Sequence, residues 1–185
     1  MNSWNVLPDK EDERKFYLAN DVGTVVRLSK RVDVDLPLLM SRLEERGIPI
    51  AYSYGVHEIY FTVLPGDDED KYAVKYGDYD RVEKRITLSC GVQARPDLHS
   101  SLVHELIHHV DMNEDFSSRE KIVEEKALKA RGLDDGYASV NVDEYVAVGF
   151  EMHYFGTREQ RRKIRKEHPR LYNLIRYIHR KYSKR

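Results

Sequence analysis

The chain has 185 residues, of which 41% are hydrophobic, and this length and composition suit one compact domain with a sizeable core. Its 31 Lys and Arg residues nearly balance its 32 Asp and Glu residues, which argues against a polycation that coats nucleic acid. Cys90 is the single cysteine, so an internal disulfide is excluded, and no apolar run of about 18 residues predicts a membrane span.

The first residues of the chain are polar and acidic. We expect residues 1–20 to form a polar lead-in and residues 21–185 to form a single domain. The lead-in lacks the basic and then apolar segments of a secretory signal. A cytoplasmic location is therefore the default expectation, although a secreted mature form would have the same sequence features.

Apolar residues alternate in the first half of the chain and recur at helical spacing in the second half. The predicted strands cover residues 24–30, 48–53, 57–64 and 85–90, with an acidic turn over 65–71. The predicted helices cover residues 35–46, 118–131, 143–155, 158–168 and 169–183. A further helix is predicted to begin after a cap at Asp97 and to extend past Val110. A loop is predicted over residues 133–142. Strands that precede helices predict an α+β fold with a small mixed sheet in the N-terminal half and a helical C-terminal half.

Basic residues are concentrated at the C-terminus. Residues 157–185 contain twelve Lys and Arg against two Glu, whereas residues 1–156 carry a net charge of −11. A basic segment of this kind can bind nucleic acid or an anionic membrane. Apolar residues recur through it at helical spacing, which favours instead a packed helix with a charged outer face. These residues are Leu171, Leu174, Ile175, Ile178 and Tyr182.

The most informative motif is the H-E-x-x-H sequence from His104 to His108, which lies within a predicted helix. Residues four apart lie on one helix face, so both imidazoles can reach one ion, and Zn²⁺ accepts imidazole nitrogen. The carboxylate of Glu105 lies about 100° further round the helix, which is the position of a general base. The motif therefore predicts a zinc-dependent hydrolase.

A catalytic zinc needs a third protein ligand and an open position. Spacing alone does not choose this ligand from the downstream candidates. They are Asp111, Glu114, Glu124, Glu125, Asp143, Glu144, Glu151 and His153. Asp111 follows His108 by three residues, and we expect it to orient a ligand imidazole rather than to bind the ion.

A second motif follows the H-E-x-x-H motif further along the chain. In the segment Tyr137-Ala-Ser-Val-Asn141-Val-Asp-Glu144-Tyr-Val-Ala147-Val-Gly-Phe150, a Tyr and an Asn precede a Glu by seven and three residues, and an Ala and a Phe follow it by three and six. Together with the H-E-x-x-H motif and Asp111, this spacing resembles the catalytic domain of anthrax toxin lethal factor. It is also similar to the small Pro-Pro endopeptidases built on that domain, which are zinc metallopeptidases of the gluzincin type. The resemblance covers roughly residues 82–183.

The resemblance implies a zincin-like fold and a zinc ion as cofactor. It implies that His104, His108 and Glu144 bind the zinc, that Glu105 activates a water molecule, and that Tyr137 stabilises the oxyanion.

The resemblance also implies a supporting set of residues around the ligands, with Asp111 orienting an imidazole and Asn141 in the same set. The family often has an acidic residue where this chain has Val148. Glu151, one turn further on, is the candidate to replace it. An extended substrate could pair with an open edge of strand 85–90. The outward residues of that strand are Arg85, Thr87 and Ser89.

The leading hypothesis is thus a monomeric zinc metalloendopeptidase that acts on a protein or peptide substrate. One alternative is a cytosolic metallopeptidase that acts on DNA-bound proteins. Another is a catalytically inactive zincin-fold protein that binds a partner through its basic C-terminal helices. Of the possible partners, nucleic acid is less favoured than a polypeptide.

Overall fold

A mixed six-stranded sheet forms the N-terminal half of the protein in the computed structural model, which describes residues 4–19, 23–63, 77–90, 98–133 and 137–184. The strands are β1 (Val6–Pro8), β2 (Lys15–Leu18), β3 (Val25–Leu28), β4 (Glu58–Thr62), β5 (Gly77–Asp80) and β6 (Arg85–Ser89). Their order is β1-β2-β3-β4-β6-β5. β4 pairs in parallel with β3 and β6, whereas the outer pairs are antiparallel.

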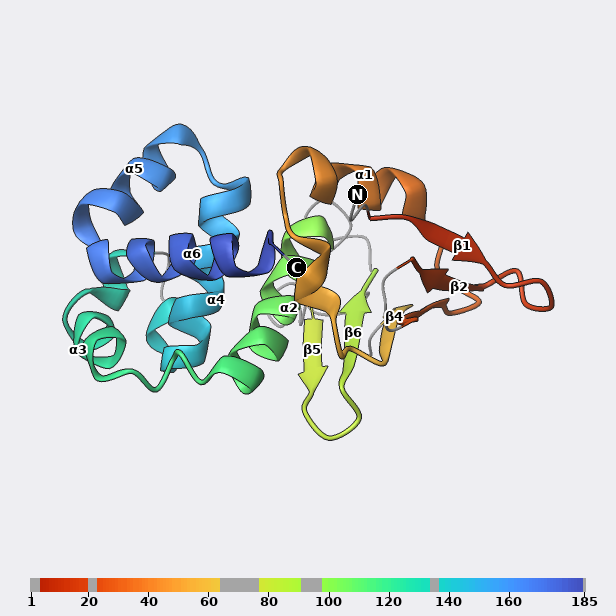
Figure 1. Ribbon diagram of the computed structural model, residues 1–185, viewed down its shortest axis with the longest axis horizontal. Coiled ribbons are helices and arrows are strands. Elements are labelled where there is room, and N and C mark those ends of the chain that lie inside the picture. Colours follow the sequence, from red (N-terminus) through yellow and green to blue (C-terminus); the bar gives the residue numbers. More distant parts are fainter. Residues whose placement is uncertain (1–3, 20–22, 64–76, 91–97, 134–136, 185) are drawn as a thin grey trace.

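Six α-helices and three short 3-10 turns complete the described part. The α-helices are α1 (Leu36–Glu45), α2 (Leu98–Glu114), α3 (Glu120–Lys129), α4 (Val142–Phe155), α5 (Arg158–Glu167) and α6 (Pro169–Tyr182). The 3-10 turns are η1 (Ile50–Ser53), η3 (Ala130–Gly132) and η4 (Tyr137–Ser139). Helices α3 to α6 gather on one side of the molecule and the sheet on the other, with α2 between them (Figure 1). The predicted α+β fold is confirmed.

The central position of α2 explains its sequence. Twelve of its 17 residues are buried, because it contacts strands β5 and β6 on one side and α4 on the other. A helix packed on two sides needs apolar residues around most of its circumference, and Leu102, Leu106 and Val110 supply one part of this surface. Each such side chain contributes roughly 1.5–3 kcal/mol when fully buried. The buried helix is a rigid support for the polar groups that it carries.

Two parts of the N-terminal half differ from the sequence prediction. Residues 48–53 were predicted as a strand, but Ile50–Ser53 form a 3-10 turn whose four residues are all buried. A short, fully buried apolar run has the same pattern in either conformation. The expected polar lead-in contains β1 and β2, and Trp4 within it is buried, with Nε1 donating to the carbonyl of Ile48 at 2.7 Å. The predicted acidic turn and the Asp97 cap lie outside the described residues.

The C-terminal helices agree with the prediction. Asn141 caps α4, and Thr157 and Gln160 form a capping box at the start of α5. The five apolar residues predicted to form the stripe of α6 are all buried. No helix in the described part of the chain has the length and apolar character needed to span a membrane.

A buried carboxylate joins three of these helices. Glu125 of α3 is 4% exposed and accepts hydrogen bonds from the backbone N–H groups of Arg170 (3.1 Å) and Leu171 (2.9 Å) in the first turn of α6. The hydroxyl of Tyr145 in α4 donates to the same carboxylate at 3.2 Å and lies 2.8 Å from Nδ1 of His168. The carboxylate thus satisfies N–H groups that a helix start leaves without partners.

We expect Glu125→Ala to lower the free energy of unfolding by roughly 2–3 kcal/mol, because it leaves buried N–H groups without an acceptor. The neighbouring Glu124→Ala is the control. Glu124 makes an exposed ion pair with Arg170 at 2.6 Å, and its loss costs at most about 1 kcal/mol. Urea denaturation of both variants measures the difference, and equal losses would contradict a special role for Glu125.

Candidate metal centre

Two histidines of α2 and one glutamate of α4 converge on one point. The ring centroids of His104 and His108, one helical turn apart, are separated by 4.9 Å. Oε2 of Glu144 lies 2.8 Å from Nε2 of His104 and 3.5 Å from Nε2 of His108. The three ligand atoms lie within 4.8 Å of one another. Ligands of a tetrahedral zinc ion are about 3.3 Å apart, so these residues fit such an ion.

The position of Glu144 follows from the start of α4. The side chain of Asn141, the N-cap, accepts a hydrogen bond from the backbone N–H of Glu144 at 2.7 Å. This bond satisfies a free N–H group and fixes the first turn of the helix. Asn141, predicted as a supporting residue, therefore acts on the geometry of Glu144 through the backbone.

Glu151 lies two turns along α4 from Glu144 and faces the other nitrogen of His104. Its Oε2 is 3.2 Å from Nδ1 of His104, and its Oε1 accepts a hydrogen bond from the hydroxyl of Ser100 at 2.6 Å. Both ring nitrogens of His104 thus face carboxylates of α4, which fixes the orientation of the ring.

The hydrogen bonds of Asp111 within the described residues are with the backbone, and the predicted orientation of an imidazole stays a prediction. Its Oδ1 accepts hydrogen bonds from the backbone N–H groups of Phe116 at 2.8 Å and Ser117 at 2.9 Å. The carboxylate closes the turn after α2, because the free N–H groups of that turn are its nearest donors. Within the described residues, Glu151 makes a carboxylate–imidazole contact of this kind with His104.

Charges in this centre shift each other's pKa values. Burial alone would lower the pKa of His104, but the hydrogen bonds with Glu144 and Glu151 raise it to about 10. Burial alone would raise the pKa of Glu144, but its hydrogen bonds with His104 and His108 hold that pKa well below its usual range. In the absence of a metal ion, a proton on His104 therefore balances the carboxylates around it.

Glu105 lies beside the three ligand residues and is 6% exposed. Burial raises the pKa of its carboxyl group, and the positive charge of His104 opposes that shift. The backbone of β5 leaves just enough room for this carboxylate, because a Cβ atom added at Gly77 would lie 2.5 Å from its Oε1 atom. No motif or periodicity in the sequence pointed to Gly77 as a residue of this site.

Tyr137 lies at the open side of the centre. The residue is 56% exposed, and its ring centroid lies 5.8 Å from that of His104. Burial, followed by the negative charge of Glu144, raises the pKa of the Tyr137 phenol to about 12. The phenol therefore keeps its proton at neutral pH and can donate a hydrogen bond.

Among the described strands, β6 lies inside the sheet and β5 at one end of it, so the predicted substrate-binding strand does not form an edge. Arg85 and Thr87 of β6 pair with Glu58 and Tyr60 of β4 on one side and with Asp80 and Asp78 of β5 on the other. Ser89 of β6 is fully buried. The sequence did not predict β5, because Gly77-Asp-Tyr-Asp80 lacks alternating apolar residues.

The side chains of Tyr79 and Arg81 hold β5 and the turn after it in place. The hydroxyl of Tyr79 lies 2.7 Å from Nδ1 of His109, and Nε2 of His109 lies 2.9 Å from the carbonyl oxygen of Tyr54. Arg81, just after β5, donates to Asp143 at the start of α4 at 2.9 Å. The edge strand is thus fixed to both helices that carry the centre.

Comparison with known proteins supports the fold. No family model matches the sequence, and no curated protein matches it. Among solved structures, the Pro-Pro endopeptidase PPEP-2 from Paenibacillus alvei superimposes with a TM-score of 0.60 at 16% sequence identity. The match covers 83% of this chain and 96% of that chain. At this identity, the likeness shows that the two proteins share a fold.

We expect a divalent metal ion to bind this centre with release of about one proton per ion at pH 7, because the proton on Nε2 of His104 must leave when that nitrogen becomes a ligand. The pKa of His104, about 10, makes apparent affinity rise by about tenfold per pH unit between pH 7 and pH 9. Calorimetric titration with Zn²⁺ in two buffers of different ionisation enthalpy counts the protons. Glu144→Gln is the control that loses the binding, and pH-independent affinity would contradict the arrangement.

Proposed function

We propose that the protein is a zinc-dependent endopeptidase that hydrolyses peptide bonds in a protein or peptide substrate. One observation carries this proposal: His104, His108 and Glu144 converge on one point, with the buried carboxylate of Glu105 beside them. Two imidazoles and one carboxylate are the protein ligands of many catalytic zinc sites. The structural likeness to an endopeptidase adds support for a peptidase.

In this proposal, His104, His108 and Glu144 hold the zinc ion. A zinc ion bound there would lower the pKa of a coordinated water molecule to about 7 and polarise the substrate carbonyl. Glu151 and Ser100 keep the ring of His104 in the orientation that presents Nε2 to the ion.

Glu105 is the general base of the proposed reaction. Its carboxylate accepts a proton from the attacking water and then delivers it to the nitrogen of the leaving amine. A carboxyl group whose pKa is raised by burial suits both steps, because it binds a proton more readily than an exposed carboxyl group.

Tyr137 stabilises the oxyanion that develops on the substrate. Its ring lies beside that of His104, its hydroxyl is hydrogen-bonded to Glu144, and its raised pKa keeps the proton on the oxygen, so the hydroxyl can turn from Glu144 to the oxyanion of a bound substrate. A hydrogen bond that strengthens as negative charge develops lowers the barrier of the reaction.

The outer edge of β5, which no described strand covers, is where an extended substrate would pair. β5 is the last strand of the sheet, and its first residue, Gly77, borders Glu105. A peptide that adds a strand there gains backbone hydrogen bonds and passes next to the general base.

We expect Glu105→Gln to retain zinc and to lose turnover by about 10²–10⁴-fold, because an amide cannot accept the proton. Digestion of a peptide library, analysed by mass spectrometry, measures turnover, and atomic absorption measures the zinc content. Glu120→Gln makes the same chemical change at an exposed site and should leave both unchanged. Full activity of the Glu105→Gln variant would refute the proposed mechanism.

We expect Gly77→Ala to lower kcat by about tenfold or more while zinc content and stability stay close to those of the native protein. The added Cβ atom displaces the end of the flexible Glu105 side chain, which costs little stability but moves the base away from its position. Val82→Ala is the control, because Val82 is 92% exposed and lies in the turn that follows β5. Equal activity of both variants would show that the position of Glu105 does not depend on β5.

A further inference from the structure

Helix α5 presents a row of basic side chains to solvent. Arg158, Arg162, Arg165 and Lys166 are all exposed and follow one another at helical spacing, so they share one face of the helix. Within the described residues, none of the four takes part in an ion pair. Ion pairs within the described part of the chain therefore do not neutralise the positive charge of this row.

Packing does not account for this row. Ile164 is the one buried residue of α5, and it anchors the helix without help from the basic side chains. Arg165 and Lys166 lie in the last turn, where positive charge stabilises the helix dipole, whereas Arg158 and Arg162, one turn apart, repel each other without any such gain. A surface of this kind suits an anionic partner.

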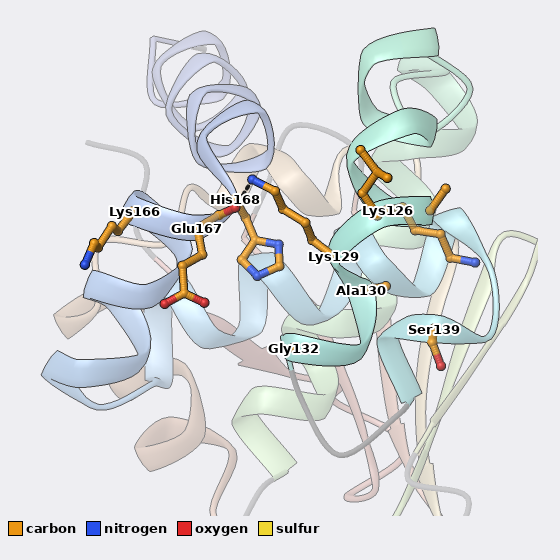
Figure 2. Close-up of a pocket in the computed structure, with 10 residues that line it drawn as sticks. Lys126, Lys129, Ala130, Gly132, Ser139, Lys166, Glu167 and His168 are labelled. Atoms are coloured by element: carbon orange, nitrogen blue, oxygen red, sulfur yellow. Dashed lines mark hydrogen bonds between the residues drawn. The ribbon is translucent and has the colours of Figure 1, made fainter.

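A pocket of 920 Å³ lies at the C-terminal end of this row. Lys166 of α5 and Lys126 of α3 lie on opposite sides of it, with their ammonium groups turned away from each other (Figure 2). Lys129 lies between them and donates to the carbonyl oxygen of Glu167 at 2.6 Å. We call the four α5 residues together with Lys126 and Lys129 the basic surface.

Small residues form part of the wall of the pocket between these lysines, and Glu167 and His168 also line it. Ala130 and Gly132 line it, and Leu128, also a lining residue, is 82% exposed. Such a wall accepts an apolar side chain, while the lysines around it attract negative charge on either side of that side chain.

The same pocket adjoins the turn that carries Tyr137. Ser139 lines the pocket and belongs to η4, the 3-10 turn that begins at Tyr137. A polypeptide bound in the pocket would therefore lie against the turn of the proposed oxyanion residue.

We propose that the basic surface and its pocket bind an acidic segment of a polypeptide in which carboxylates flank one apolar side chain. The assignment of this segment to the substrate rests on the proposed endopeptidase function. Nucleic acid is the other polyanion to consider, but His168 is the one aromatic residue among those that line the pocket, and at 1% exposure it offers no accessible ring on which a base could stack.

The test measures binding and not hydrolysis, so its outcome is separate from that of the proposed activity. The full chain carrying Glu105→Gln is titrated into a fluorescein-labelled peptide with glutamates on both sides of one Phe, and anisotropy reports binding. We expect saturable binding that weakens as salt is added, and much weaker binding of the peptide with Gln in place of Glu. Replacing the Phe by Gly should also weaken binding, and an unchanged affinity would overturn the role of the pocket.

Charge reversal locates the binding surface. Arg162→Glu together with Arg165→Glu should weaken binding by about tenfold or more. Arg31→Glu together with Arg42→Glu makes the same change of net charge at exposed positions outside the helical half and should change affinity less than about twofold. Equal losses in the two double variants would overturn the proposal, as would tighter binding of a single-stranded oligodeoxynucleotide of the same charge.

A second peptide distinguishes a changed surface charge from misfolding of the double variant. A lysine-containing peptide of the same length should bind the Arg162→Glu/Arg165→Glu protein more tightly than it binds the parent. Failure of that reversal in a variant with an unchanged unfolding temperature would contradict a direct charge interaction at α5.

Discussion

The contact between His104 on α2 and two carboxylates on α4 is the interaction on which the rest of the structure depends. It brings together residues 40 and 47 positions apart and gathers Glu144, Glu151 and Glu105 around two imidazoles. Carboxylates that lose water at such close range are unfavourable unless positive charge lies among them. A proton on His104 supplies that charge in the absence of metal, and a divalent cation would supply more. The centre is thus organised around a cation.

The surrounding fold keeps this arrangement in place. α2 is supported by strands on one side and by α4 on the other, and each partner fixes a different polar group. The sheet limits the space for Glu105 through Gly77, whereas the N-cap at Asn141 fixes Glu144. Glu125 joins α3, α4 and α6 behind the site and bonds to Tyr145, the residue next to Glu144.

Sequence patterns predicted the helical half well, because long amphipathic segments with caps at Asn141 and Thr157 leave few alternatives. They also predicted that His104 and His108 share a face. Periodicity did not select Glu144 from eight candidates, and the resemblance to a known family supplied that choice. Strand β5 was missed because its residues are polar, and η1 was misread because its residues are all buried. Asp111 and Glu151 could not be assigned from spacing, since their partners depend on how α2 ends and how α4 packs against it.

The hydrogen bonds of His109 have a consequence for which residues can serve the ion. The sequence runs His108-His109, so Glu105 and His109 are also four residues apart and offer a competing ligand pair. The carbonyl oxygen of Tyr54 requires a proton on Nε2 of His109, and Nδ1 then accepts from Tyr79. Both ring nitrogens of His109 are thus hydrogen-bonded to the surrounding protein, so neither is available to a metal ion. The pair Glu105 and His109 therefore cannot replace the pair His104 and His108.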